Sequence, residues 1–273
     1  MAYKVLDLFK DLPGTNCGEC GRSGCFAFVT AVYLEGAPLS GCPHPSPEAL
    51  REMAARLEEG RARGEGRRPE ASEQALGHLR SVMAERDLRE VAERCGARYE
   101  AGPPEAVEVT FLGVPHRVLR DDVKALEGPE TTVWVKIFLL IYATRATGDP
   151  PEGRWVSYRE LPNTVSKSRS FEACAERIAR AFEGRPGDLE GAASRLGGER
   201  VPHGSAPWAY RFRALPRVEI LLLFWDRDEE FPARAMILLD RGVLGYLDQE
   251  ALVFLAEAFA QRMLGEGLEG VIP

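Results

Sequence analysis

Four cysteines near the N-terminus constrain the fold of this chain more than any other feature. Cys17, Cys20, Cys25 and Cys42 follow the spacing C-x2-C-x4-C-x16-C, and Pro43 comes directly after the last of them. Four soft thiolates converge on one metal centre only if the chain between them bends back on itself. The glycines among these cysteines allow such bends, because glycine adopts positive φ without a Cβ clash. The spacing therefore predicts that all four cysteines bind one [4Fe-4S] cluster.

The apolar stretch CFAFVTAVYLEG begins at Cys25 and predicts a short helix that ends at Gly36. Cys25 would then lie in the first turn, where backbone N–H groups and the positive end of the helix stabilise thiolate charge. Five side chains of this helix are expected to shield the metal centre from water: Phe26, Phe28, Val29, Val32 and Tyr33.

Zinc is the main alternative, because sites of four cysteines also bind zinc. Zinc ribbons usually present two C-x2-C pairs, whereas here the second half consists of a lone Cys25 and a distant Cys42. A proline after the final cysteine is typical of ferredoxin-like sequences. The pattern favours iron–sulfur over zinc. Disulfides are less favoured still, since the chain shows no signal peptide and Cys17 and Cys20 are too close for an easy bridge.

Residues 3 to 45 resemble the iron–sulfur domain of the B subunit of Rnf-type electron-transport complexes. They also resemble that of the large subunit of the corrinoid iron–sulfur protein of acetyl-CoA metabolism. The lead-in LPGTNCGECG, the CGxxGC core and the closing Cys42-Pro43 carry the resemblance. In those relatives the cluster moves single electrons. The resemblance therefore implies one-electron transfer with a redox protein partner, such as a corrinoid or other low-potential enzyme, in anaerobic or corrinoid and one-carbon metabolism.

Most of the 273 residues lie outside this module. The Gly- and Arg-rich stretch GRARGEGRRPE predicts a linker. We therefore expect a small, mostly helical cluster-binding domain at 1–60, a linker at 61–71 and a larger domain at 72–267. In the larger domain, alternating and continuous apolar runs that predict strands cluster between helical segments. The nearly apolar run RVEILLLFW fits a central strand, and Asp87, Ser170 and Asp248 are expected to cap helices. This order predicts an α+β fold with an antiparallel or mixed sheet rather than a βαβ repeat.

The larger region resembles the family called domain of unknown function 3786 over roughly residues 80–265. The resemblance rests on GRWVSYRELP, on LPRVEILLLFWDRDEEFPARAMILLD and on the C-terminal helix. It implies a domain that is often joined to such a cluster module, and it brings no biochemical activity with it.

Charge and hydropathy narrow the classes of partner. A net charge of −7 and a pI near 5.4 give no electrostatic footprint for nucleic acid. The nearest candidate for a membrane span, Val133 to Ala143, is apolar except for Lys136. It is shorter than the roughly 20 residues that a span needs, and it predicts a buried helix capped by Thr131 or Thr132. We expect a cytoplasmic protein with neither a nucleic-acid partner nor a membrane span.

Two further cysteines, Cys95 and Cys174, lie on the apolar stripes of predicted helices, which favours core packing over catalysis. Among the histidines, His78, His116 and His203 have no second ligand at metal spacing and are expected to be solvated. His44 follows Cys42 by two residues and would make reduction proton-coupled if it lay beside the cluster. A plain loop histidine is the favoured interpretation.

The most plausible ligand surface of the larger domain contains Trp155, Tyr158, Arg159 and Glu160, because aromatic rings beside an arginine grip flat or anionic groups. A structural pairing of Arg159 with Glu160 is favoured over this role. The acidic segment 226–230 offers oxygen ligands but lacks the pattern of a calcium loop, so it predicts a solvated hairpin turn.

Three functions remain open, and no catalytic constellation decides whether the chain is an enzyme. The favoured hypothesis is one-electron transfer, in which the larger domain binds the redox partner. The second is a redox enzyme with an active site in the larger domain. The third is a sensor or scaffold, in which cluster binding controls docking.

Overall fold

The computed structural model describes residues 5–20, 22, 24–62, 69–268 and 271. The chain divides into two compact units, Met1–Glu73 and Gln74–Pro273, and each has its own hydrophobic core. Of the predicted linker at 61–71, residues 63–68 lie outside the described residues, and its two ends continue the neighbouring helices α3 and α4.

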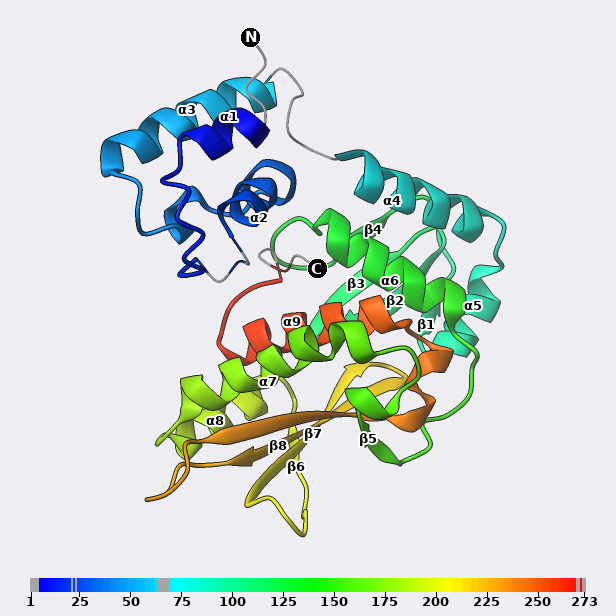
Figure 1. Ribbon diagram of the computed structural model, residues 1–273. Coiled ribbons are helices and arrows are strands. Elements are labelled where there is room, and N and C mark those ends of the chain that lie inside the picture. The colour runs from blue at the N-terminus through cyan, green and yellow to red at the C-terminus, as the bar shows by residue number, and fades with distance from the viewer. Residues whose placement is uncertain (1–4, 21, 23, 63–68, 269–270, 272–273) are drawn as a thin grey trace. The chain divides into compact units, whose positions relative to one another are not determined.

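In the first unit, all regular elements of the described residues are helical, and loops connect them (Figure 1). Its elements are α1 (Val5–Lys10), α2 (Cys25–Thr30), a π-helical turn (Ala31–Glu35), a 3-10 turn (Leu39–Gly41), α3 (Pro47–Ala62) and the start of α4 (Pro69–Ala84).

Two local signals set helix ends in the first unit. Gly36 ends the helical run from Cys25 with φ of 77°, as predicted, although its last turn is π-helical. Ser46 caps α3, because its Oγ accepts a hydrogen bond from the N–H of Ala49 at 3.2 Å. These helices enclose a small core made of Leu8, Leu12, Cys25, Phe28, Val29, Val32, Cys42, Met53 and Leu57.

The second unit confirms the α+β prediction, with two sheets that are both antiparallel. Its helices are α4, α5 (Leu88–Cys95), α6 (Val133–Arg145), α7 (Ser168–Phe182), α8 (Pro186–Arg195) and α9 (Gln249–Met263). The four-stranded sheet has the order β1 (Arg98–Glu100), β2 (Ala106–Phe111), β3 (Val114–Val118), β4 (Val123–Ala125). The five-stranded sheet has the order β5 (Trp155–Ser157), β9 (Arg234–Asp240), β8 (Val218–Trp225), β7 (Trp208–Leu215), β6 (Glu199–Arg200).

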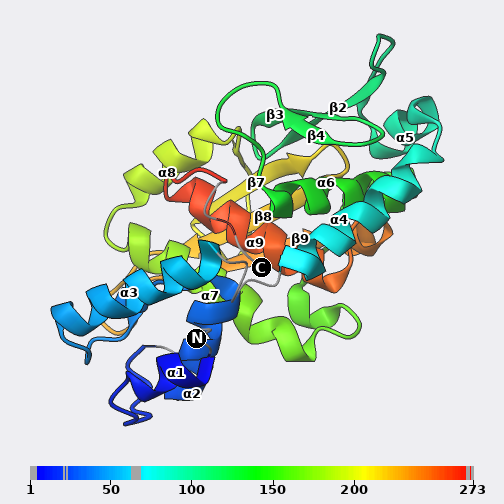
Figure 2. The ribbon, with the colours of Figure 1, turned by 90° about the horizontal axis from the view of Figure 1, so that it is seen from above.

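The five-stranded sheet carries the main core. The almost wholly apolar strand β8 is central, as predicted, because both of its faces are buried. Strand β7 alternates, with Arg211 and Arg213 exposed between buried neighbours. Helices α7 and α9 pack side by side on one face of this sheet (Figures 1 and 2), where the rings of Phe212 and Phe259 meet edge to face at 4.8 Å.

The four-stranded sheet packs against α5 and α6. Strands β2 and β3 form a hairpin whose turn places Leu112 and Gly113 at positive φ. The N–H of Leu112 donates to the carbonyl of Ala214 at 2.9 Å and joins this turn to β7. Phe111 contacts Phe138 of α6, with ring centroids 4.7 Å apart.

Most helix starts in the second unit follow their cap residues. Asp87, Thr132 and Asp248 accept backbone N–H bonds at the starts of α5, α6 and α9, as predicted. The predicted cap of α7 at Ser170 is wrong. The 3-10 turn at 165–167 runs directly into α7, so the helix already begins at Ser168. In the described part of the chain, no helix combines the length and the apolar character that crossing a membrane requires.

Candidate metal centre

The four N-terminal cysteines lie on three short elements of the first unit. Cys17 and Cys20 belong to the loop after α1, Cys25 is the first residue of α2, and Cys42 follows the 3-10 turn. All four are free thiols. Cys25 and Cys42 are buried members of the core, Cys20 packs against that core, and Cys17 is exposed. The site therefore has an inner side against apolar residues and an outer side toward solvent.

Asn16 holds Cys25 in place through two hydrogen bonds. Its Oδ1 accepts the N–H of Cys25 at 2.8 Å, and its own N–H donates to the Sγ of Cys25 at 3.4 Å. Asn16 adopts φ of 50°, which asparagine tolerates better than most residues. A Cβ on Gly24 would lie 2.8 Å from Oδ1 of Asn16, so this contact requires glycine at position 24. Sequence reasoning missed Asn16, although an asparagine directly before the first cysteine was a usable signal.

The apolar backing of the site is largely as expected. Phe28, Val29 and Val32 are buried. The ring of Phe28 would lie 3.3 Å from a Cβ on Gly41, so a small residue beside Cys42 lets the ring pack there. The prediction for Phe26 is wrong: it is 52% exposed, because α2 turns that side chain outward against Phe9. It does not shield the site.

The outer side of the site is polar. The Nε2 of His44 lies 3.1 Å from the Sγ of Cys17 and 3.2 Å from Oε2 of Glu19. The pKa of the Cys17 thiol lies below its ordinary value, chiefly because the backbone at Glu19 hydrogen-bonds to the sulfur, with smaller contributions from Thr15 and His44. The favoured interpretation of His44 as a plain loop histidine is therefore wrong. The turn after Cys42 folds back over the first cysteine.

These residues fit a group that is held by thiolates. Asn16 gives an N–H bond to one sulfur, and hydrogen bonds favour the ionised form of Cys17. Within the described residues, one trio of metal-binding side chains also has its ligand atoms within 4.8 Å of one another, namely Cys17, Glu19 and His44. Such a mixed set of sulfur, oxygen and nitrogen suits zinc.

The two other cysteines differ chemically from these four. Cys95 and Cys174 are buried in the main core, as predicted, and burial raises the pKa of each thiol to about 12. Cys174 donates to Oε2 of Glu257 at 3.3 Å. Both thiols are protonated at neutral pH and act as small apolar side chains.

Of the ligand surface suggested by residues 155–160, Tyr158 and Arg159 line a cavity, but their polar groups already have partners within the fold. Tyr158 is buried, stacks on Phe171 at 4.5 Å and donates its O–H to the carbonyl of Gln249. The predicted pair of Arg159 with Glu160 is wrong: the Nη2 of Arg159 binds Oε2 of Glu172 on α7 at 2.6 Å. The carboxylate of Glu160 instead accepts the backbone N–H and the hydroxyl of Ser157, in a capping box.

The acidic segment 226–230 is a hairpin turn, as predicted. Asp226 accepts the N–H groups of Gly184 and Arg227, and Asp228 accepts those of Glu230 and Phe231. The two carboxylates thus organise the turn between β8 and β9.

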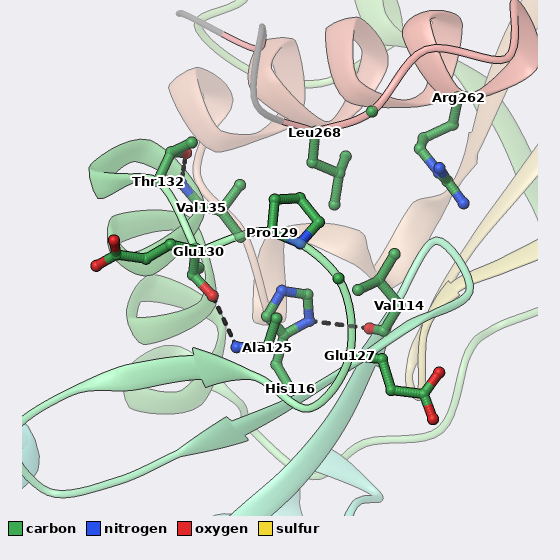
Figure 3. A pocket seen from close by; sticks show the side chains of 13 residues that line it. Val114, His116, Ala125, Glu127, Pro129, Glu130, Thr132, Val135, Arg262 and Leu268 are labelled. Carbon is green, nitrogen blue, oxygen red and sulfur yellow. Dashed lines mark hydrogen bonds between the residues drawn. The ribbon is translucent and has the colours of Figure 1, made fainter.

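His78 and His203 are exposed, as expected, whereas the expectation for His116 is wrong. His116 lies on β3, is only 2% exposed and lines a cavity (Figure 3). It occupies the same face of β3 as Val118, which points into the core. Burial lowers the pKa of its imidazole below the ordinary value. The sequence offered no sign of this cavity, because residues far apart in the chain form its walls.

Comparison with known families identifies an iron–sulfur domain at the N-terminus. Residues 12–44 match the family described as "Putative Fe-S cluster". A segment of 51 residues is 41% identical to the B subunit of an ion-translocating oxidoreductase complex from Methanosarcina acetivorans, covering 19% of each chain. A segment of 49 residues is 41% identical to a corrinoid/iron-sulfur protein large subunit from Moorella thermoacetica, covering 18% of this chain and 11% of the relative.

A third relative is the gamma subunit of an acetyl-CoA decarbonylase/synthase complex from Methanothermobacter thermautotrophicus, which is 32% identical over 53 residues. That match covers 19% of this chain and 12% of the relative. The chain thus spans less than a fifth of the length of these curated relatives. The matches support an iron–sulfur protein and leave the type of cluster open.

The larger part of the chain has a different affiliation. No solved structure gives a significant match. Residues 87–262, which are more than half of the chain and contain both sheets, match a family whose function is unknown. The chain therefore belongs to the family called domain of unknown function 3786, and it carries an iron–sulfur domain in front of it.

Proposed function

We propose that this protein transfers single electrons through a [4Fe-4S] cluster bound by Cys17, Cys20, Cys25 and Cys42. A bound cluster of this type supplies reversible one-electron oxidation and reduction. The protein supplies four thiolates, the hydrogen bonds around them and an apolar wall on one side. The spacing of the cysteines supports this cofactor over zinc, because it lacks the second C-x2-C pair of a zinc ribbon.

The single observation that carries the proposal is the unequal exposure of the four cysteines. Cys25 and Cys42 are 7% and 5% exposed, whereas Cys17 is exposed and Cys20 is half-buried. Two ligands in the core would hold the site firmly, and two at the surface would leave one side open to a docking protein. A purely structural site needs no such open side.

The proposed partner is a redox protein. The relatives that match the first unit are named as subunits of an ion-translocating oxidoreductase, a corrinoid/iron-sulfur protein and an acetyl-CoA decarbonylase/synthase. These names support electron exchange with a low-potential or corrinoid enzyme in anaerobic or one-carbon metabolism. The second unit would recognise that partner. The cytoplasmic location stays a prediction from the sequence.

Anaerobic purification tests the cofactor directly. We expect iron and acid-labile sulfide in equal amounts, an EPR signal after reduction and a reversible one-electron potentiometric titration. Zinc in place of iron, or a reduced protein that stays EPR-silent at every accessible potential, would overturn the proposal.

A zinc site is the second candidate, because Cys17, Glu19 and His44 lie within ligand distance of one another. The variant His44→Ala distinguishes this zinc site from a cluster bound by the four cysteines. If zinc is the native metal, this variant loses most of its metal. If the four cysteines bind a cluster, the variant keeps its iron and sulfide.

A further inference from the structure

A small cavity in the second unit opens beside His116. The proposed electron transfer does not use it. Its volume is about 140 Å³. The walls come from β3, from the loop between β4 and α6, from the first turn of α6, and from α9 with the segment that follows it (Figure 3). A cavity of this size accepts several water molecules or an organic molecule of a few carbon atoms.

His116 presents an unused acceptor to this cavity. Its Nδ1 lies 2.9 Å from the carbonyl oxygen of Val114, and because a carbonyl only accepts, Nδ1 carries the proton. The neutral ring, which burial favours, then has a lone pair on Nε2. Within the described part of the chain, Val114 is the one hydrogen-bond partner of this ring. Figure 3 shows the other ring nitrogen turned away from Val114, under Pro129.

His116 thus brings a hydrogen-bond acceptor to the wall of the cavity, which favours a ligand that carries a donor. The imidazole is only 2% exposed, and its place on β3 is fixed by pairing with Val109 on one side and Ala125 on the other. The bond from Nδ1 to the carbonyl of Val114 restrains the ring itself.

The charge of the cavity favours an anion. Arg262 extends from α9 into the lining, and its Nε is buried without a hydrogen-bond partner among the described residues. Glu127 and Glu130 also line the cavity, but Figure 3 shows both carboxylates pointing away from it. The start of α6, capped by Thr132, adds the partial positive charge of a helix N-terminus.

The remaining walls are apolar. Val114, Val135 and Leu268 face the space that His116 and Arg262 border (Figure 3). We propose that this cavity binds a small hydroxycarboxylic acid. Its carboxylate pairs with Arg262, its hydroxyl donates to Nε2 of His116, and its carbon atoms contact Val114, Val135 and Leu268.

Binding of chosen acids to the full-length protein tests this assignment. Imidazole nitrogens are observed by NMR with ¹⁵N-labelled histidine while lactate, propionate or 1,2-propanediol is added. We expect lactate to shift the Nε2 resonance of His116 in a saturable way. Propionate lacks the hydroxyl and 1,2-propanediol lacks the carboxylate, so each should bind about ten-fold more weakly or worse.

Two arginine variants serve as the test and its matched control. Arg262→Gln should weaken lactate binding by about ten-fold or more, because one charge-assisted bond is lost. Arg117→Gln removes a charge from the opposite, exposed face of the same strand as His116 and should leave binding unchanged. Thermal unfolding confirms that both variants fold.

Three results would overturn the proposal. They are the absence of a saturable shift with lactate, equal binding of lactate, propionate and propanediol, and wild-type affinity in Arg262→Gln.

Discussion

Buried cysteines occur in both units, and their surroundings differ in a way that exposure does not reveal. Cys25 and Cys42 in the first unit are 7% and 5% exposed, and Cys95 and Cys174 in the second are 0% and 3% exposed. Cys25 accepts an N–H bond from Asn16, whereas Cys95 is surrounded by the main apolar core, which raises its pKa to about 12. Burial alone therefore does not separate a candidate metal ligand from a packing residue. What distinguishes Cys25 from Cys95 is the hydrogen bond that its sulfur accepts from Asn16.

Replacing one buried cysteine in each unit should give the largest difference between the two units. Cys25→Ser should abolish or convert the cluster, because a hydroxyl is a poor ligand for iron in such a site. Cys174→Ser should leave the iron and sulfide content and the EPR signal intact. A normal cluster in Cys25→Ser, or cluster loss in Cys174→Ser, would contradict the assignment.

In the second unit, a buried carboxylate allows the contribution of buried hydrogen bonds to stability to be measured. Asp240 is 3% exposed and accepts the N–H groups of Glu152, Gly153 and Gly242. Asp240→Asn replaces one acceptor oxygen with a donor, so the free energy of unfolding should fall by about 2 kcal/mol. Urea unfolding followed by tryptophan fluorescence measures this, since all the tryptophans lie in the second unit. An unchanged midpoint would show that these bonds contribute nothing.

The two hydrogen bonds between Asn16 and Cys25 can be tested in the same way in the first unit, with a smaller expected loss of stability. Asn16→Ala removes the acceptor for the N–H of Cys25 and should destabilise the cluster-binding loop by about 1 kcal/mol. The measurement is the rate at which the loaded protein loses iron to a chelator. Asn163→Ala, at an asparagine of positive φ in the second unit, is the matched control and should not change that rate.

The same contact predicts a coupling between positions 16 and 24. Gly24→Ala should speed iron loss in the wild type, because its Cβ would meet Oδ1 of Asn16 at 2.8 Å. In the Asn16→Ala background, the added methyl group should do less harm. If the effects of the two substitutions on the rate of iron loss were strictly additive, the contact between positions 16 and 24 would be contradicted.

The smallest expected effect is a pH dependence from Cys95. Its thiol is protonated up to about pH 12 in the folded state but ionises near its ordinary pKa of 9.0 in the unfolded state. Because folding raises this pKa, the thiol's contribution to the free energy of unfolding is fully present below pH 9. That contribution is lost as the pH rises toward 12. Between pH 9 and 10, the wild type should lose about 1 kcal/mol more than Cys95→Ala. Identical pH profiles for the two proteins would contradict the raised pKa.

Local sequence signals predicted much of the secondary structure. Asp87, Thr132 and Asp248 begin helices where the sequence indicated, and Gly36 ends one, because a cap is a contact between residues a few positions apart. The continuous apolar run indicated the central strand β8. The short strands β1, β4, β5 and β6 were missed, since two or three residues are too few to show a period.

Contacts between distant residues account for the errors in the candidate sites. Arg159 binds Glu172 rather than its neighbour Glu160, because α7 packs beside that loop. His44 lies beside Cys17, which is 27 residues away. His116 is buried because β3 is paired on both sides. In each case the deciding partner lies on another element, where no local pattern points to it.

Four properties can be read from the amino-acid sequence alone: the residue types that can bind a soft metal, the spacing between them, the capped helices and the α+β order of elements. These properties depend on side-chain chemistry and on neighbours within one or two turns. Only the tertiary structure decided which of four cysteines face the core, that Asn16 holds one of them, and that His116 and Arg262 share a cavity. Those outcomes depend on how strands pair and helices pack, which brings residues together across long stretches of chain.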